Sequence, residues 1–138
     1  MVKFSIRLFK MKINSYDCDG VVFFNKDIPG LRPEPNDIII TGRSFEERPE
    51  TERMLAKRSI NNQVFYNPLK FDDKTRESSG RHKAYTIKDL QAKGYEIVIH
   101  WEDDEIQADV IKQLCPEVNI ILLKHNLTNK ENVRHLTY

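Results

Sequence analysis

The feature that most constrains the fold is a series of short runs, rich in Ile and Val, that alternate with stretches of helical periodicity. Runs suited to β-strands lie at residues 12–17, 37–41, 63–66, 96–101 and 119–123. Three of them, DIIIT, EIVIHW and NIILL, alternate little, as strands covered on both faces do. Helical patterns fall at residues 49–57, 83–93 and 104–114. This order predicts an α/β fold, a compact Rossmann-like three-layer sandwich around a mostly parallel five-stranded sheet.

Three stretches fall outside this alternation. Residues 20–36 contain three prolines and no helical period, so we expect an extended hairpin or loop there. Residues 1–11 alternate weakly, which is compatible with an edge strand, and the polar tail from Asn126 onward is expected to pack loosely. Residues 74–81, which are rich in basic side chains, are expected to form a solvated loop.

Length and composition exclude several classes of protein. The 138 residues suit a single domain, 1–138, and the net charge of +1 gives no basic field over the whole surface, so a polyanion would have to be bound locally. No apolar run approaches the roughly 20 residues of a membrane-spanning helix, and the N-terminus has no apolar signal core. We therefore expect a cytoplasmic domain without a membrane partner. Cys18 and Cys115 fit neither a disulfide framework nor a cysteine-dependent phosphatase.

Polar side chains follow the predicted strands at one edge of the sheet. Asp17 and Asp19 follow the first strand, and their spacing of two places both carboxylates on one side of an extended chain. Gly20 then allows a sharp turn. Thr41 ends the second strand, and Lys83 is expected to open the helix before the fourth. In open parallel sheets this edge is where ligands bind.

An acidic run, Glu102 to Asp104, directly follows the fourth predicted strand. Clustered carboxylates take up protons unless a cation lies between them. Oxygen ligands favour Mg²⁺, which also binds substrate phosphate. One carboxylate can then attack phosphorus, a second can act as general acid and base, and Thr41 and Lys83 can hold the transferring oxygens.

The segments DCDGVVF (17–23), IIITGR (38–43), Lys83 in RHKAYTIKDL and IVIHWEDD (97–104) resemble the four motifs of the haloacid dehalogenase (HAD) superfamily, in the same order. The resemblance spans roughly residues 12–123, nearly the whole chain. It implies a Mg²⁺-dependent phosphomonoester hydrolase that acts through an aspartyl-phosphate intermediate. The short spacings from Asp19 to Thr41 and from Thr41 to Lys83 leave little room for an inserted lid, so a phosphatase of the capless type with an open site is expected.

The resemblance also implies the roles of individual residues. Asp17 would be the nucleophile and a Mg²⁺ ligand, and Asp19 the general acid and base that also gives a backbone carbonyl to the metal. The residues implied to bind the substrate phosphate are Thr41, Gly42, Arg43 and Lys83. Asp103 is the best match for the last metal ligand, with Glu102 or Asp104 assisting, because a strand end shifted by one residue reverses which side chain faces inward. Lys74 and Lys88 are alternatives to Lys83.

Capless members of the superfamily act on large phosphorylated substrates or are closed by a partner subunit, so a homo-oligomer is one expectation. The stretch TGRSFEERPETERMLAKRSI (41–60) is similar, more weakly, to capless polynucleotide phosphatases. That likeness implies a nucleotide or nucleic-acid end as substrate. The basic residues expected to contact its backbone are Arg43, Arg48, Lys70, Lys74, Arg76 and Arg81. The aromatic residues expected to stack on a base are Tyr66, Phe71 and Trp101.

Two other interpretations compete with this one. The abbreviated first connection and the missing lid suit a catalytically silent HAD-like module that binds a phosphorylated ligand or a protein. A response-regulator receiver domain is disfavoured, because no Asp ends the third strand and Lys83 precedes the last acids. His100 and Trp101 are expected to pack rather than to react.

Overall fold

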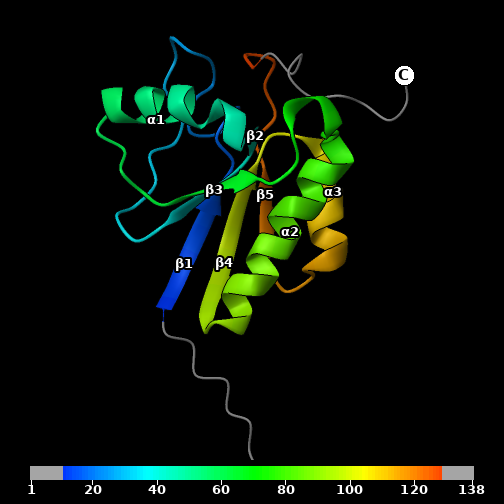
Figure 1. The fold of residues 1–138 in the computed structure, drawn as a ribbon. Coiled ribbons are helices and arrows are strands. Elements are labelled where there is room, and N and C mark those ends of the chain that lie inside the picture. The colour runs from blue at the N-terminus through cyan, green and yellow to red at the C-terminus, as the bar shows by residue number, and fades with distance from the viewer. Residues whose placement is uncertain (1–10, 129–138) are drawn as a thin grey trace, which may run out of the picture.

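A computed structural model describes residues 11–128 and contains one five-stranded sheet (Figure 1). The strands are β1 (Met11–Tyr16), β2 (Ile38–Ser44), β3 (Val64–Asn67), β4 (Tyr95–Glu102) and β5 (Asn119–Leu122). They lie in the order β3-β2-β1-β4-β5, and every neighbouring pair is parallel. The predicted α/β class and parallel sheet are thereby confirmed. The edge strand suggested for residues 1–11 falls almost entirely outside the described residues.

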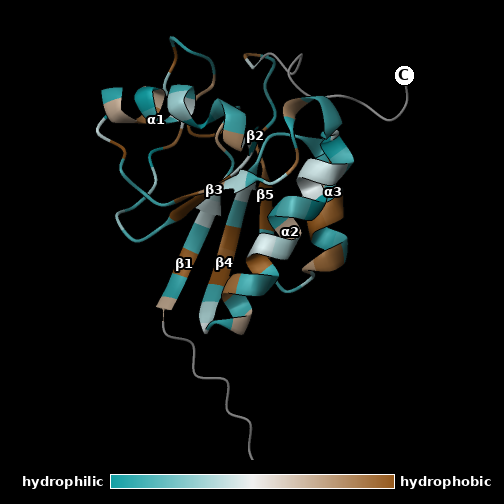
Figure 2. Ribbon diagram, in the orientation of Figure 1, coloured by the Kyte–Doolittle hydropathy of each residue, from teal (hydrophilic) through white to brown (hydrophobic). Residues whose placement is uncertain are grey.

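Helices and an irregular segment cover the two faces of this sheet. The helices are α1 (Arg48–Lys57), α2 (Arg76–Ala92) and α3 (Glu105–Leu114), with short 3₁₀ turns at Phe45–Glu47 and Phe71–Asp73. Figure 2 shows apolar residues gathered in the strands and α3, and hydrophilic residues over much of α1 and α2. Within residues 11–128 no inserted domain interrupts this sandwich.

The three consecutive isoleucines of β2 show how the sheet builds a core on each face. Ile38 and Ile40 join the cluster formed with α2 and α3, whereas Ile39 joins the cluster formed with α1 and the segment that follows β1. Successive strand residues point to opposite faces, so a strand covered on both sides is apolar throughout. For this reason, apolar runs with little alternation indicated strands that are covered on both faces.

The start of α2 differs from the prediction. The helix begins at Arg76, and Lys83, expected to open it, lies near its middle. Thr75 caps the helix, since its side chain accepts a hydrogen bond from the Ser78 amide while the Ser78 hydroxyl bonds the Thr75 backbone. The first turns, RESSGRH, carry no apolar period. Gly80 in these turns lies close to α3, where a β-carbon would lie 2.9 Å from that of Val110. Residues 76–81 are therefore helical and not a solvated loop.

The connection between β1 and β2 is irregular, as predicted. It is held by isolated bridges that pair Phe23 with Asp19 and with Pro29, and by Arg32, which donates hydrogen bonds to the carbonyls of Arg58 and Ser59 at the end of α1. The chain passes from β1 to β2 and β3 on one side and returns through α2 to β4 on the other. The carboxyl ends of β1 and β4 therefore meet at the topological switch point, where a ligand crevice is expected.

Candidate functional site

Asp17 lies at the switch point, directly after β1, and is only 5% exposed. Its Oδ1 atom accepts a hydrogen bond from the Cys18 amide at 2.8 Å and lies 2.9 Å from Lys83 Nζ. Burial raises the pKa of the Asp17 carboxyl well above its usual range, and the charges of Glu102 and Asp103 raise it further against the opposing effect of Lys83. Ionisation of Asp17 at this position therefore costs free energy, unless a second cation is present in addition to Lys83.

Lys83 reaches this point from the middle of α2, and its side chain is fully buried. Its ammonium group also pairs with Glu102, with Nζ 2.7 Å from Oε1. Burial lowers the pKa of Lys83, but the carboxylates of Asp17 and Glu102 outweigh that effect and raise it above its usual value. Lys83 thus stays charged and links the ends of β1 and β4.

Glu102, the last residue of β4, is fully buried and is held by four donors. Oε1 lies near Lys83 Nζ and 3.2 Å from His100 Nε2, while Oε2 accepts the amides of Asp103 at 3.1 Å and Asp104 at 3.3 Å. Burial would raise the Glu102 pKa, but Lys83 and His100 lower it below its usual range. Glu102 is therefore an ionised anchor whose oxygens are largely occupied.

Asp103 completes a group of three carboxylates. Asp17, Glu102 and Asp103 each offer an oxygen, and these oxygens all lie within 4.8 Å of one another. The Asp103 carboxylate rests against Gly20, where a β-carbon would lie 1.9 Å from Asp103 Oδ2 and where φ is +88°. The three carboxylates thus gather oxygen donors beside Lys83, and a set of oxygen donors of this kind fits a hard divalent cation such as Mg²⁺.

Asp104 takes a different part. Its Oδ1 accepts the Ile106 amide at 2.9 Å as the cap of α3, and both oxygens are bound by Arg76 at 2.6 and 2.7 Å. The sequence left open which acid of the run faces inward. In the structure Glu102 and Asp103 join Asp17, and Asp104 holds the ends of α2 and α3 together.

Asp19 lies beside this group but is bound to Arg43. Arg43 Nε lies 2.8 Å from Oδ2 and Nη2 lies 2.9 Å from Oδ1, while Nη1 contacts the Thr51 hydroxyl of α1 at 3.2 Å. Burial lowers the Arg43 pKa, but the hydrogen bonds with Asp19 raise it above its usual value. The Asp19 side chain is 43% exposed, so it faces solvent as a substrate would require. Each oxygen of Asp19 thus accepts one hydrogen bond from Arg43.

Thr41, expected to end the second strand, and Gly42 lie inside β2, which continues to Ser44. Thr41 is fully buried, and its Oγ1 accepts the Arg43 amide at 3.0 Å. The Gly42 carbonyl accepts a hydrogen bond from Lys74 Nζ at 3.2 Å, and Lys74 also pairs with Glu47 at 2.5 Å. Lys74 therefore supports the carboxyl-terminal part of β2 and is not the lysine paired with Asp17.

Two supporting sets of contacts were not predicted. His100 bridges Glu102 to the Ser15 hydroxyl, with Nδ1 2.7 Å from Oγ. After β5, the Leu123 amide donates to the Glu102 carbonyl and His125 Nε2 donates to the Gly20 carbonyl, both at 2.7 Å. The segment beyond β5 thus ties both carboxylate-bearing loops together. The spacing of motifs in one sequence does not reveal such contacts, because they join residues far apart in the chain.

The C-terminal tail also makes a contact beyond the point from which it was predicted to pack loosely. Although residues from Asn126 onward were expected to pack loosely, the Thr128 hydroxyl donates to the Phe24 carbonyl at 2.7 Å. A polar residue can be fixed by one hydrogen bond to an irregular loop, which hydrophobic periodicity does not report. The remainder of that tail, residues 129–138, lies outside the described residues.

Most residues predicted to contact nucleic acid are engaged within the protein. Besides the pairs of Arg43, Lys74 and Arg76, Arg48 pairs with Glu52 at 2.9 Å. Lys70 and Arg81 are exposed.

The aromatic residues proposed for base stacking also have neighbours within the chain. Trp101 stacks on Tyr16 with ring centroids 6.2 Å apart. Tyr66 is 7% exposed and packs against Phe45 at 5.6 Å. Phe71 is half-buried, with Lys74 Nζ 4.9 Å from its ring centroid.

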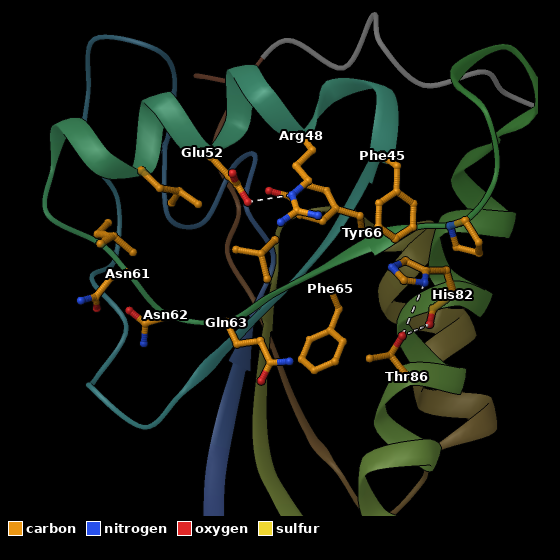
Figure 3. A pocket seen from close by; sticks show the side chains of 14 residues that line it. Phe45, Arg48, Glu52, Asn61, Asn62, Gln63, Phe65, Tyr66, His82 and Thr86 are labelled. Carbon is orange, nitrogen blue, oxygen red and sulfur yellow. Dashed lines mark hydrogen bonds and ion pairs between the residues drawn. The ribbon is translucent and has the colours of Figure 1, made fainter.

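A pocket of about 720 Å³ lies beside β3, between α1 and α2 (Figure 3). Asn61 and Asn62 lie toward one end of it, and His82 and Thr86 toward the other. None of the predicted catalytic, phosphate-binding or metal-binding residues lines this pocket. The carboxylate group at β1 and β4 is therefore a separate place in the fold.

These contacts define a group of four residues at the switch point of a parallel α/β sheet, Asp17, Lys83, Glu102 and Asp103, which we call the carboxylate centre. No family model matches the chain, and neither a curated protein nor a solved structure matches it. None of the helices in residues 11–128 combines the length and apolarity needed to cross a membrane.

Proposed function

We propose that the protein is a Mg²⁺-dependent phosphomonoester hydrolase of the HAD type that acts on a nucleotide or polynucleotide-end phosphate. The observation that carries the proposal is the double ion pair of Lys83, 2.9 Å from Asp17 and 2.7 Å from Glu102, with Asp103 beside them. A buried lysine that holds two carboxylates at the carboxyl ends of adjacent strands carries a large desolvation cost, and strongly perturbed ionisable groups of this kind cluster at functional sites.

Asp17 is the nucleophile of the proposed reaction. Lys83 and the Cys18 amide both contact Oδ1, which fixes the rotamer of the carboxylate. An oxygen of Asp17 bonds to phosphorus while the bond from phosphorus to the ester oxygen breaks. The leaving oxygen takes a proton from Asp19. Water then bonds to phosphorus and gives a proton to Asp19, the bond to Asp17 breaks, and inorganic phosphate leaves.

Arg43 and Thr41 are proposed to bind the substrate phosphate. A phosphate that enters beside Asp19 offers Arg43 a bidentate partner of higher charge than the carboxylate. Arg43 then turns from Asp19 to the phosphate, which frees Asp19 for proton transfer. Lys74 holds the Gly42 backbone and so keeps this part of β2 in place.

The metal ion is proposed to be held by Asp17 and Asp103 with the backbone carbonyl of Asp19. Glu102 is less suited as a direct ligand, because its oxygens already accept from Lys83, His100 and two backbone amides. When bound, Mg²⁺ supplies positive charge to the phosphate oxygens and to the crowded carboxylates.

Hydrolysis of p-nitrophenyl phosphate and of 3′- and 5′-phosphorylated oligonucleotides tests the proposal. We expect turnover that requires Mg²⁺ and is lost in Asp17→Asn. Absence of turnover on every substrate, or full turnover by Asp17→Asn, would refute it.

A silent phosphate-binding module is the second candidate, because both oxygens of Asp19 are occupied by Arg43. This candidate predicts that a phosphorylated oligonucleotide binds with Mg²⁺ and is recovered intact. Release of inorganic phosphate in a malachite-green assay would exclude it.

A further inference from the structure

A groove of about 410 Å³ lies between α1 and the loop that follows β1; we call it the α1 groove. Its lining residues are Phe23, Lys26, Asp27, Glu50, Arg53, Met54, Lys57 and Arg58. Lys26, Arg53 and Lys57 are exposed, and Arg58 is half-buried with its guanidinium carbon 4.3 Å from the centroid of the Phe23 ring. The groove thus carries four cations around a partly apolar floor, against the two acids Asp27 and Glu50.

The cations of the α1 groove have no ion pair with any residue in 11–128. This sets them apart from the basic residues around the carboxylates, since Arg43, Lys74, Arg76 and Lys83 each pair with an acid at 2.9 Å or less. Their charge is therefore available to an external anion. On a chain with a net charge of +1, such a concentration is local.

The α1 groove is linked to the candidate active site through two contacts. Arg43, which binds Asp19, also contacts Thr51 of α1 at 3.2 Å, and Glu50 and Met54 of the groove flank Thr51 on that helix. On the other wall, Phe23 forms a bridge with Asp19. Figure 1 shows α1 and the loop after β1 together at the carboxyl end of the strands. Both walls of the groove are therefore connected to the Asp19 side of the candidate active site.

We propose that the α1 groove binds the sugar-phosphate backbone of a nucleic-acid strand whose terminal phosphate lies at Asp17. This inference rests on the proposed function, and it names the polymer as the substrate in place of a free nucleotide. A strand carries a phosphate at every residue, so it matches several separate cations, whereas a mononucleotide reaches the catalytic carboxylates alone. Arg58 lies over Phe23 and donates a hydrogen bond to the Lys26 carbonyl at 3.5 Å, so it supports the wall of the groove. The exposed side chains of Lys26, Arg53 and Lys57 supply the charge that the phosphates meet.

The test is fluorescence anisotropy with a labelled, unphosphorylated oligothymidylate of about 10 nucleotides, which measures binding without turnover. The groove variant is Arg53→Glu with Lys57→Glu. The matched control is Lys88→Glu with Lys112→Glu, which makes the same charge change on exposed positions of α2 and α3. Thermal unfolding of all three proteins verifies the fold.

We expect the wild type and the control to bind with affinity that falls as salt rises from about 50 to about 200 mM. The groove variant should bind about 10-fold more weakly, with a salt slope smaller by about 1.4, since each phosphate contact on a single strand contributes about 0.7. Equal loss in the control, or wild-type binding by the groove variant, would overturn the assignment. So would equal binding of a polyglutamate peptide, which would assign the groove to an acidic polypeptide.

The same proteins separate this inference from the proposed function. Hydrolysis of p-nitrophenyl phosphate by a wild type that fails to bind the oligonucleotide would overturn the groove and leave the phosphatase standing. Oligonucleotide binding that depends on the groove, in a protein that hydrolyses no phosphate ester, would support the groove and overturn the phosphatase.

Discussion

Two charged regions lie next to each other at the carboxyl end of the sheet and differ in how their charges are neutralised. In the carboxylate centre the ammonium of Lys83 is fully buried and paired with Asp17 and Glu102. In the α1 groove Arg53 and Lys57 are exposed and have no ion pair within residues 11–128. Burial makes the first set of interactions strong and short-ranged, whereas water and salt screen the second. The first arrangement suits chemistry on one phosphate, and the second suits loose attraction of a polyanion.

The largest expected effect is on catalysis. Asp17→Asn should lower the turnover of p-nitrophenyl phosphate by about 10⁴-fold or more, because the nucleophile is removed. Its unfolding temperature should not fall, since a buried carboxyl with a raised pKa is replaced by a neutral group. Asp109→Asn, an exposed position on α3, is the matched control and should keep wild-type turnover. Parallel losses in both variants would mean that the change in charge, and not Asp17, is responsible.

The next largest effect is on stability, and it distinguishes the paired cation Lys83 from the unpaired cations of the α1 groove. Lys83→Met should lower the unfolding free energy by about 3–5 kcal/mol, because it leaves two carboxylates without their buried partner. Arg53→Met in the α1 groove should change it by less than about 0.5 kcal/mol. Urea denaturation of both variants measures the difference. Similar values for the two would remove the distinction between the regions.

Gly20 offers a test of how closely the carboxylate centre is packed. Gly20→Ala should lower the unfolding free energy by about 1–3 kcal/mol, because alanine at φ +88° is strained and its β-carbon meets the Asp103 carboxylate. The displaced Asp103 should also weaken Mg²⁺ binding in calorimetry. Gly94→Ala, at φ +98° after α2, is the control: we expect a similar loss of stability with unchanged Mg²⁺ affinity. Unchanged affinity in both variants would argue against Asp103 as a ligand.

The smallest effect concerns acid stability. Burial, helped by the neighbouring charge of Lys83, lowers the pKa of His82 from 6.5 to about 4. Below its unfolded-state pKa the unfolded chain binds the extra proton, so the stability contributed above pH 6.5 is lost progressively as the pH falls towards 4. His82→Gln should lower the midpoint of acid unfolding by about half a pH unit. A midpoint that stays fixed would show that His82 does not limit acid stability.

The sequence predicted the strands well because each is a run of residues that must be apolar on both faces. Ile38, Ile39 and Ile40 carry that signal independently of the rest of the chain. The start of α2 was missed because its first turns are polar and its cap is a pair of hydroxyl side chains, Thr75 and Ser78. Local capping of this kind leaves a much weaker pattern than burial.

The sequence predicted which residues form the carboxylate centre, but it did not predict the contacts that these residues make. Asp17, Lys83 and Asp103 were expected at one edge because parallel strands end together, and the structure brings them there. That Arg43 binds Asp19, and that His100 supports Glu102, depends on side-chain rotamers and on pairs far apart in the chain. Their catalytic roles remain predictions.

The central claim is that Asp17 accepts a phosphoryl group while its neighbouring carboxylates share a divalent cation. ¹⁹F nuclear magnetic resonance of the protein with beryllofluoride, a mimic of the phosphoryl group, tests this claim most directly. We predict a bound signal that requires Mg²⁺ and is absent in Asp17→Asn. A wild-type protein that gives only the signals of free beryllofluoride at saturating Mg²⁺ would contradict the account.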